Sequence, residues 1–167
     1  MFFIAYSDID VCIKRVNEDH TDFWKRSLYR SFFSFVEFTA FRLRYLLLAG
    51  LKDHTLTVSP EETLILQEQT PELNDKGNVK LKARFFSFEA YLRFTIETYA
   101  RHFDIKGAQN FDSDGWEAMK KSVVVRNLLT HPKTLEHLFI SDKELADLNT
   151  AINWYFKIIK ELISNWS

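Results

Sequence analysis

The sequence is poor in residues that interrupt regular structure, with only four Gly and three Pro among 167 positions. Glycine and proline mark turns and break helices, so their scarcity favours long helices over many short strands. A chain of this length is typical of one domain that buries its own core. We therefore expect residues 1–167 to form a single, mostly helical domain.

Cysteine is almost absent, since Cys12 is the only one. A lone cysteine excludes a disulfide within one chain and a cysteine-rich zinc site. The histidines are scattered, and His131 and His137 lie six positions apart across a proline, which is not a typical metal-ligand spacing. The sequence therefore predicts no metal, no cofactor and a reducing compartment such as the cytoplasm.

The chain also lacks a large excess of positive or negative charge, and it has no long uninterrupted apolar run. Its formal net charge is −1, so any contact with RNA must come from a local patch. The most apolar stretch, residues 28–51, is interrupted by Arg30, Glu37, Arg42 and Arg44, which argues against a membrane span. The first residues have no basic segment before an apolar run, so we expect no signal peptide and no membrane contact.

Apolar residues at helical spacing are abundant, and 46% of the chain is hydrophobic. The long helix from residue 22 is apolar on several neighbouring rows, so we expect it to be buried over most of its circumference and to end before Gly50. The predicted helices cover residues 8–18, 22–49, 87–103, 112 or 114 to about 131, and 142 to at least 163.

Two serines carry the signature of a capping box at the start of a helix. Ser59 and Ser141 are each followed three residues later by a glutamate, Glu62 and Glu144. Pro60 suits the first turn of the helix that follows Ser59. The sequence thus predicts a short helix after residue 59 and the last long helix after residue 141.

A turn signal at residues 74–77 separates two short segments with weak strand character. We expect residues 79–83 to pair with residues 65–69 as a small β-hairpin. The long helices can bury their apolar stripes only against one another. The predicted fold is therefore an all-α, up-and-down bundle of four to five main helices with a small hairpin insertion.

No Gly-rich phosphate loop, His-Glu-x-x-His helix or Gly-x-Ser-x-Gly turn is present, but one helix end combines suitable polar groups. Arg126 and Asn127 follow an apolar run, and His131 comes directly before Pro132, which disfavours further helix. Five helical steps rise roughly 7.5 Å, which a long arginine side chain can span. An arginine that stabilises phosphate charge and a histidine that moves a proton are the minimum for cleaving a phosphodiester.

This stretch resembles the HEPN superfamily, whose ribonucleases carry an Arg, four to six residues and a His, with a polar residue often after the Arg. The matching residues are Arg126, Asn127 and His131. The resemblance implies a small helical domain that dimerises so that two motifs build one composite site. It also implies metal-independent cleavage in which the RNA 2′-hydroxyl attacks the phosphate, leaving 2′,3′-cyclic phosphate and 5′-hydroxyl ends.

Many relatives are toxins of toxin–antitoxin pairs or act in defence against phage, so the resemblance also implies a cognate antitoxin or defence partner. Some relatives that pair with a nucleotidyltransferase have a tyrosine two residues after the histidine, where AMP is added. Lys133 stands there in this chain, so we do not expect that control. Alternatively, Arg126 pairs with a buried carboxylate and His131 only caps its helix.

Further polar residues are candidates for supporting roles. Glu37 and Arg30 share a face of the second helix with Arg44, and Glu37 could orient Arg126 or receive a proton. Alternatively, Glu37 forms an internal ion pair with Arg30 or Arg44. The candidates for RNA phosphate contacts, which could equally be a solvated face, are Lys120, Lys121 and Lys133.

The sequence thus predicts a metal-independent endoribonuclease of the toxin or phage-defence type that acts on RNA as a homodimer. Two alternatives belong to other classes: a catalytically silent helical domain for interaction or dimerisation, and a regulatory partner of another effector.

Overall fold

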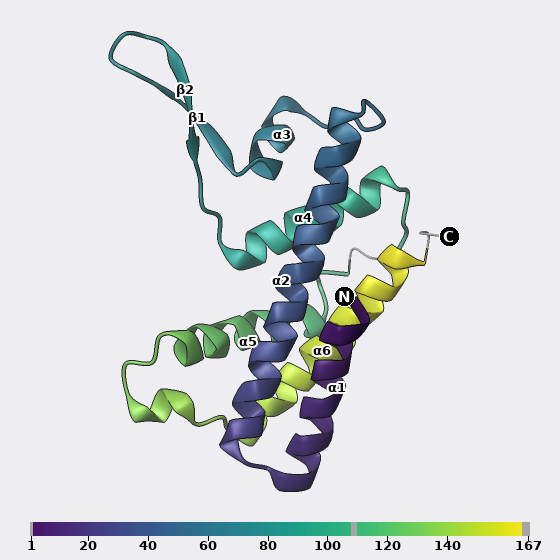
Figure 1. Cartoon of the computed structure of the whole chain (residues 1–167), viewed down its shortest axis with the longest axis vertical. Helices are drawn as coiled ribbons and strands as arrows, with labels where there is room; N and C mark the ends of the chain where they lie inside the picture. Colours follow the sequence, from purple (N-terminus) through teal and green to yellow (C-terminus); the bar gives the residue numbers. More distant parts are fainter. Residues whose placement is uncertain (1, 108–109, 165–167) are drawn as a thin grey trace. The chain divides into compact units, whose positions relative to one another are not determined.

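The computed structural model describes residues 2–107 and 110–164 and is 70% helical (Figure 1). The all-α fold with a small hairpin is confirmed. Within the described ranges the elements are α1 Phe2–Asp19, α2 Asp22–Lys52, α3 Pro60–Leu66, β1 Gln69–Leu73, β2 Val79–Ala83, α4 Phe88–His102, α5 Asp114–Thr130, the 3-10 helix η1 Leu135–Leu138 and α6 Asp142–Ile163.

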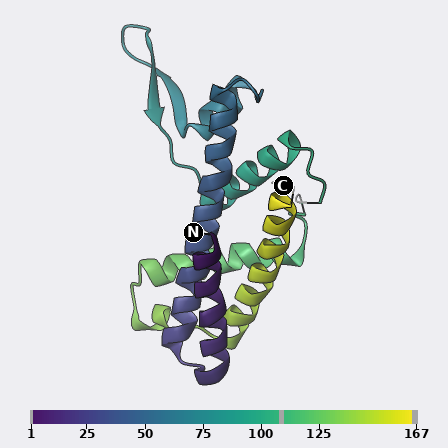
Figure 2. The ribbon, with the colours of Figure 1, turned by 45° about the vertical axis from the view of Figure 1, so that its right-hand side comes forward.

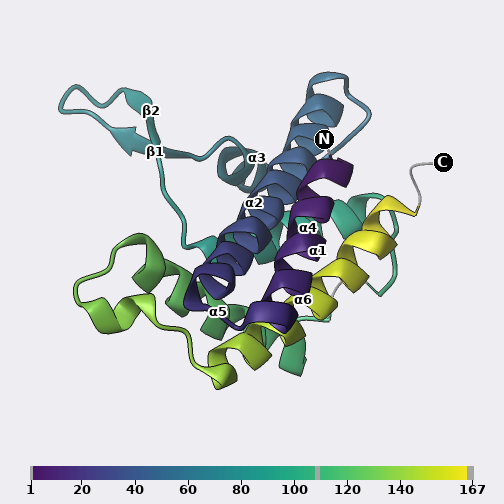
Figure 3. The same cartoon turned by 60° about the horizontal axis from the view of Figure 1, so that its bottom comes forward.

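The chain forms two compact units, Met1–Thr39 with Gly107–Ser167, and Ala40–Lys106. In the first unit, α1 and the first part of α2 run antiparallel, and α5 packs against α6 (Figures 1 and 3). The second unit holds the last part of α2 with α3, the two strands and α4 (Figure 2).

Tyr155 of α6 lies at the centre of the first unit and is completely buried. The rings of Phe32 and Phe35 of α2 meet it edge-on, with centroids 6.0 and 6.1 Å away. Its hydroxyl bonds to the hydroxyl of Thr39, which also donates to the carbonyl oxygens of Phe35 and Val36. The apolar residues of α2 therefore pack on α6, and the buried hydroxyls of Tyr155 and Thr39 are both hydrogen-bonded.

A second aromatic cluster joins α5 to α6 in the same unit. The rings of Trp116 and Trp154 lie 5.5 Å apart, and both contact Phe111. Gly115 permits this approach, because a Cβ atom there would overlap the side chain of Trp154. This packing fixes the N-terminal half of α5 against α6.

In the second unit, Arg44 of α2 is held by α3 and by the residue that precedes β1. Its Nε donates to the carbonyl oxygen of Leu66 over 2.8 Å, and its Nη1 lies 3.1 Å from Glu68 Oε1. Its guanidinium also lies 6.0 Å from the ring centroid of Tyr91 in α4. Arg44 thus pairs with Glu68, so the alternative of an ion pair between Arg44 and Glu37 is wrong.

Both predicted capping boxes are confirmed. Ser59 and Ser141 each accept the backbone N–H of the glutamate three residues later, and the Glu62 and Glu144 carboxylates accept the N–H of the capping serine. Helices α4 and α5 also begin after serine caps, which are Ser87 and Ser113. Local side-chain hydrogen bonds therefore set the start of four helices.

The predicted end of α2 at Gly50 is wrong, because the helix continues to Lys52. Gly50 instead leaves space for Leu56, since a Cβ atom at Gly50 would overlap the Leu56 side chain. His54, with a φ of 56°, takes the left-handed conformation after the helix. The first helix was also predicted too short, since α1 extends over Phe2–Asp19.

The partner strand of the hairpin was predicted wrongly. The strand at residues 79–83 is β2, but its partner is Gln69–Leu73, which lies four residues further along the chain than the predicted 65–69. Helix α3 continues to Leu66, and Gln67 caps its end, so these residues are not available to a ladder. Asn74 closes the turn, because its Oδ1 accepts the backbone N–H groups of Lys76 and Asn78.

Helix α2 is buried or half-buried around most of its circumference, as predicted, and one face is open to solvent. Arg30, Ser34 and Glu37 are exposed, whereas Phe32, Phe33 and other apolar residues between them are buried. The charges on this face therefore avoid the cost of burial. Among residues 2–107 and 110–164, no helix combines the length and the apolarity that crossing a membrane requires.

Candidate active site

The predicted motif lies at the C-terminal end of α5, within the first unit. The helix ends at Thr130, and His131 is its C-cap, with φ −129° and ψ 62°. Pro132 follows and cannot continue the helical hydrogen bonds. The predicted boundary of this helix is therefore confirmed, and it places His131 at the point where the chain leaves the helix.

Arg126 points from α5 toward α2. Its Nη2 pairs with the Glu37 carboxylate, and its guanidinium carbon lies 5.9 Å from the ring centroid of Phe33. The Arg126 side chain is 30% exposed and that of Glu37 is 48% exposed. A carboxylate and an aromatic ring thus hold the guanidinium at the surface, and the pairing with a buried carboxylate that we considered is not observed.

Asn127 contacts both other residues of the motif. Its side-chain Oδ1 accepts a hydrogen bond of 3.1 Å from Arg126 Nη1. Its backbone carbonyl accepts the N–H of His131 over 3.0 Å. The second bond is the ordinary backbone bond of a helix, which any residue at position 127 would make, so only the bond to Arg126 depends on the asparagine side chain.

His131 is exposed, and its position on the helix differs from that of Arg126. At 3.6 residues per turn, five steps separate the two Cα positions by about 140° around the axis. Helical spacing instead places His131 on the same side as Val124 and Leu128, which are 59% and 37% exposed. We call Val124, Leu128 and His131 the His131 face of α5.

The chain beyond His131 is fastened to α2 by two basic side chains. Lys25, which is only 8% exposed, donates to the carbonyl oxygen of Ile140 over 3.1 Å and pairs with Asp142. Arg26 Nη1 donates to the Leu138 carbonyl oxygen over 2.8 Å. These contacts hold the segment between α5 and α6, and so the direction in which the chain leaves His131.

The three candidate lysines differ in their surroundings. Lys120 lies 2.6 Å from Glu117 of its own helix, and Lys121 lies 3.6 Å from Asp147 of α6. Lys133 is exposed in the loop after Pro132. The acidic neighbours weaken the positive potential at Lys120 and Lys121, so Lys133 is the stronger candidate for a phosphate contact.

Arg30 is not brought into the site. It is exposed on α2, two turns before Glu37, and forms no ion pair with the part of the chain that the structure describes. Of the two α2 residues that the sequence suggested, the structure therefore brings only Glu37 to Arg126.

Sequence analysis missed three contacts around the motif. Phe33 lies beside the guanidinium, and its place one turn before Glu37 was the available signal. Thr130 Oγ1 donates to the Arg126 carbonyl oxygen over 2.8 Å. His137 Nδ1 accepts the Lys133 N–H over 3.1 Å, which closes the loop after the helix.

The described residues include no group of three or more His, Cys, Asp or Glu side chains that could hold a metal ion. What the site offers chemically is one guanidinium, one exposed imidazole and a carboxylate that pairs with the guanidinium. Comparison with known proteins adds no relative: no family model, no curated protein and no solved structure matches this chain.

Proposed function

We propose that this chain is a HEPN-like, metal-independent endoribonuclease of the toxin or phage-defence type, acting as a homodimer in the cytoplasm. The observation that carries the proposal is the hydrogen bond from Arg126 to the Asn127 side chain, next to an exposed His131 at the end of the same helix. Arg126 and His131 thus both lie in the last turns of α5, at an exposed helix end, but on different sides of the helix.

In the proposed reaction, the RNA 2′-oxygen attacks the adjacent phosphorus and the bond to the 5′-oxygen breaks. Arg126 stabilises the negative charge that grows on the phosphate oxygens. His131 accepts the proton of the 2′-hydroxyl or donates one to the leaving 5′-oxygen, and a water molecule makes the other proton transfer. Asn127 orients Arg126, and Glu37 holds the guanidinium in place until the phosphate binds.

The geometry of α5 supports a composite site in a dimer. Arg126 and His131 leave the helix about 140° apart, so one phosphate does not meet both side chains of one chain easily. A second copy whose His131 face meets the Arg126 side of α5, with the reverse contact by symmetry, brings each histidine near the other copy's arginine. The exposed Val124 and Leu128 supply apolar area for such a contact.

A second candidate function is a silent interaction domain that binds a protein partner through the same surface. The exposed side chains of Val124, Leu135 and Phe139 favour it, because large apolar residues in water mark interfaces. In this reading Arg126 and His131 only stabilise the end of α5, and substituting them does not change what the protein does to RNA.

Expression in a bacterial host separates the two functions. We expect the wild-type chain to slow growth and Arg126→Ala to relieve this effect, because losing a charge-stabilising group costs about 10²–10³ in rate. Arg42→Ala, an exposed arginine outside the site, is the matched control and should remain toxic. If wild type and Arg126→Ala affect growth equally at equal protein levels, the interaction domain is the better account.

A further inference from the structure

The β1–β2 hairpin of the second unit has one uncharged face that is open to water. In the ladder, Pro71 lies opposite Leu81, and Leu73 lies opposite Val79. Successive strand residues point to opposite sides, so these four residues share one face. We call Pro71, Leu73, Val79 and Leu81 the aliphatic face. Its two leucines and its valine are 73%, 52% and 65% exposed, in the order Leu73, Leu81 and Val79.

The charged residues of the ladder lie on the opposite face. Glu72 lies opposite Lys80, and Thr70 lies opposite Lys82, one step out of phase with the aliphatic pairs. Lys82 also forms an ion pair with Glu72. The ribbon is therefore amphipathic, with aliphatic side chains on one side and lysines on the other.

The hairpin is basic in a chain that is slightly acidic. Residues 69–84 contain four basic and two acidic side chains, so their formal net charge is +2, whereas that of the whole chain is −1. The basic residues are Lys76, Lys80, Lys82 and Arg84. Positive charge is thus concentrated beside an exposed apolar face, and this combination fits a partner that is both anionic and apolar.

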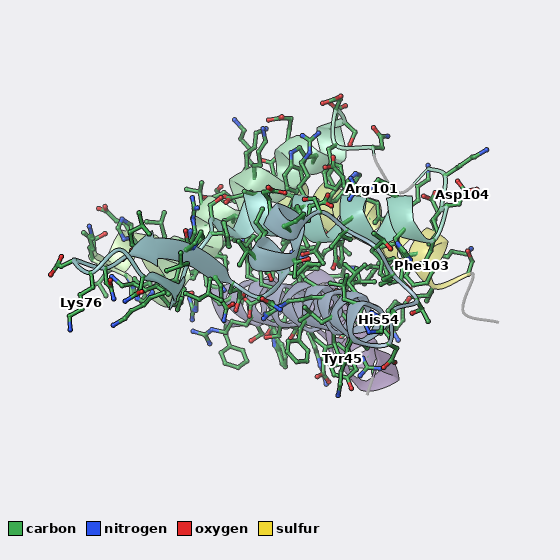
Figure 4. The ribbon with its side chains drawn as sticks, turned by 90° about the horizontal axis from the view of Figure 1, so that it is seen from above. Tyr45, His54, Lys76, Arg101, Phe103 and Asp104 are labelled. Atoms are coloured by element: carbon green, nitrogen blue, oxygen red, sulfur yellow. The ribbon has the colours of Figure 1, made fainter. Side chains whose placement is uncertain are left out.

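The hairpin extends away from the helices of its own unit. The strands project beyond α3 and α4, and Lys76 at the turn lies far from Arg101 at the end of α4 (Figures 2 and 4). Among residues 40–106, all of which the structure describes, no helix covers the aliphatic face. Phe85, which follows the ladder, is 96% exposed. The aliphatic face and this ring are therefore open to a partner outside the second unit.

The two faces together decide among possible partners. RNA would use the lysines but would leave the aliphatic side chains in water. A second copy of the hairpin carries the same positive charge, which opposes that contact. The surface of an anionic membrane offers negative headgroups above an apolar layer, so it satisfies both faces of the ribbon at once.

The backbone of the hairpin limits how deeply it can insert. The sheet has two strands, so each strand has one outer edge whose N–H and C=O groups point away from the ladder. Such groups do not enter hydrocarbon without a partner. The ribbon therefore lies among the headgroups, and only the aliphatic side chains reach the acyl chains. The lysines on the other face stay within the ~10 Å over which charges interact at 0.1 M salt.

We propose that the β1–β2 hairpin docks on an anionic membrane surface, with its aliphatic face toward the acyl chains. The expectation of no membrane contact came from the lack of a spanning segment and of a signal peptide, and docking on the surface needs neither. The contact is reversible, because four aliphatic side chains bury little apolar area. It goes beyond the proposed function and does not depend on RNA cleavage.

Co-sedimentation of the full chain with lipid vesicles, in the absence of RNA, tests the proposal. Wild type should bind vesicles of equal parts phosphatidylglycerol and phosphatidylcholine, and should bind pure phosphatidylcholine at least about tenfold more weakly. Leu81→Glu should weaken binding to the anionic vesicles by about tenfold or more, because a buried leucine is lost and the carboxylate is repelled. Leu135→Glu, the same change at a leucine of η1 that is 78% exposed, is the matched control and should bind like wild type.

A second pair of variants tests the basic face. Lys80→Gln leaves the aliphatic face intact and should weaken binding to the anionic vesicles about fivefold, as expected for one basic residue near such a surface. Its weak binding to pure phosphatidylcholine should not change. Lys157→Gln, at an exposed lysine of α6, is the control and should change binding less than about twofold. Equal effects of Lys80→Gln and Lys157→Gln overturn the proposal.

A fluorescent label measures insertion independently, because Cys12 is buried and an introduced cysteine is the reactive one. With anionic vesicles, an environment-sensitive dye on Leu81→Cys should shift its emission to shorter wavelength, and the same dye on Leu135→Cys should not. Equal shifts at the two positions, or no binding of wild type to anionic vesicles, overturn the proposal. Loss of binding to a labelled RNA in Leu81→Glu, with unchanged vesicle binding, assigns the hairpin to RNA and also overturns it.

Discussion

Glu37 of α2 forms an ion pair with Arg126 of α5, although 89 positions separate them in the sequence. The pair sits over the ring of Phe33 and is partly exposed. Exposed ion pairs contribute little to stability, about 0–1 kcal/mol. The ion pair therefore adds little to the stability of the packing between α2 and α5, and its main effect is to hold the Arg126 guanidinium in one position.

Glu37→Gln should reduce RNA cleavage about tenfold while changing the free energy of unfolding by less than about 1 kcal/mol. The amide retains one hydrogen bond to Arg126 but loses the charge that orients it. Cleavage rates and urea denaturation of the same preparation measure both effects. Glu136→Gln, an exposed glutamate in η1, is the control. If Glu37→Gln cleaves RNA at the wild-type rate, Glu37 does not position Arg126 for cleavage.

Mixing two inactive variants tests the composite site. In a mixed dimer of Arg126→Ala and His131→Ala, one of the two sites combines the intact arginine of one copy with the intact histidine of the other. We expect an equimolar mixture to recover up to about a quarter of the wild-type rate after refolding together, because about half of the dimers are mixed and each of these has one intact site of two. Each variant refolded alone is the control, and no recovery would indicate sites built within single chains.

The buried tyrosines predict how stability depends on pH. Burial raises the pKa of Tyr155 and of Tyr29 above the ordinary value of 10.0, and that of Tyr91 to about 12. The unfolded chain releases these protons first, so stability is complete below pH 10 and falls as the pH rises above it. Chemical denaturation at pH 8 and pH 10.5 measures this loss.

Tyr155→Phe isolates one of these groups. At neutral pH it should cost about 1 kcal/mol, because the Thr39 hydroxyl loses one partner but still donates to a backbone carbonyl. Above pH 10 its stability should fall less steeply than that of wild type. Tyr45→Phe, an exposed tyrosine, should behave like wild type. Equal slopes for Tyr155→Phe and wild type would contradict the assignment.

Four helices end in a non-glycine residue with positive φ, and His54 and Asp104 are two of them (Figure 4). This conformation costs an L-residue about 1 kcal/mol or more, which glycine avoids. His54→Gly should therefore stabilise the chain by about 0.5–1 kcal/mol in thermal or urea denaturation. His54→Ala removes the same imidazole but keeps Cβ, so it should not stabilise. Equal effects would show that the backbone conformation is not the cause.

These helix ends explain why the starts of the serine-capped helices were predicted better than the end of α2, although the start of α1 was also missed. A capping box such as that of Ser141 and Glu144 lies within four consecutive residues, so it is visible in the sequence. The end of α2 depends instead on Leu56 packing against Gly50, and the residue that turns the chain is His54. A rule that looks for glycine after a helix fails where glycine serves packing.

The site was only partly predictable, because contacts between residues that are far apart in the sequence leave no local pattern. The Arg126, Asn127 and His131 motif is local, and its position at the end of a helix followed from Pro132. The sequence offered Glu37 either as a partner of Arg126 or in an ion pair with Arg30 or Arg44, and choosing between these needs the packing of α5 near α2, which no spacing encodes. The exposure of one face of α2 was missed because its polar residues stand between large apolar ones.

Cleavage of an end-labelled RNA in EDTA by wild type, His131→Ala and His54→Ala tests the central claim most directly. Wild type and the control His54→Ala should cut and leave 2′,3′-cyclic phosphate ends. His131→Ala should be slower by at least about 10²-fold, as expected for loss of a proton-transferring group. Cleavage by His131→Ala at the wild-type rate, or no cleavage by wild type, would contradict the account and leave the interaction domain as the better explanation.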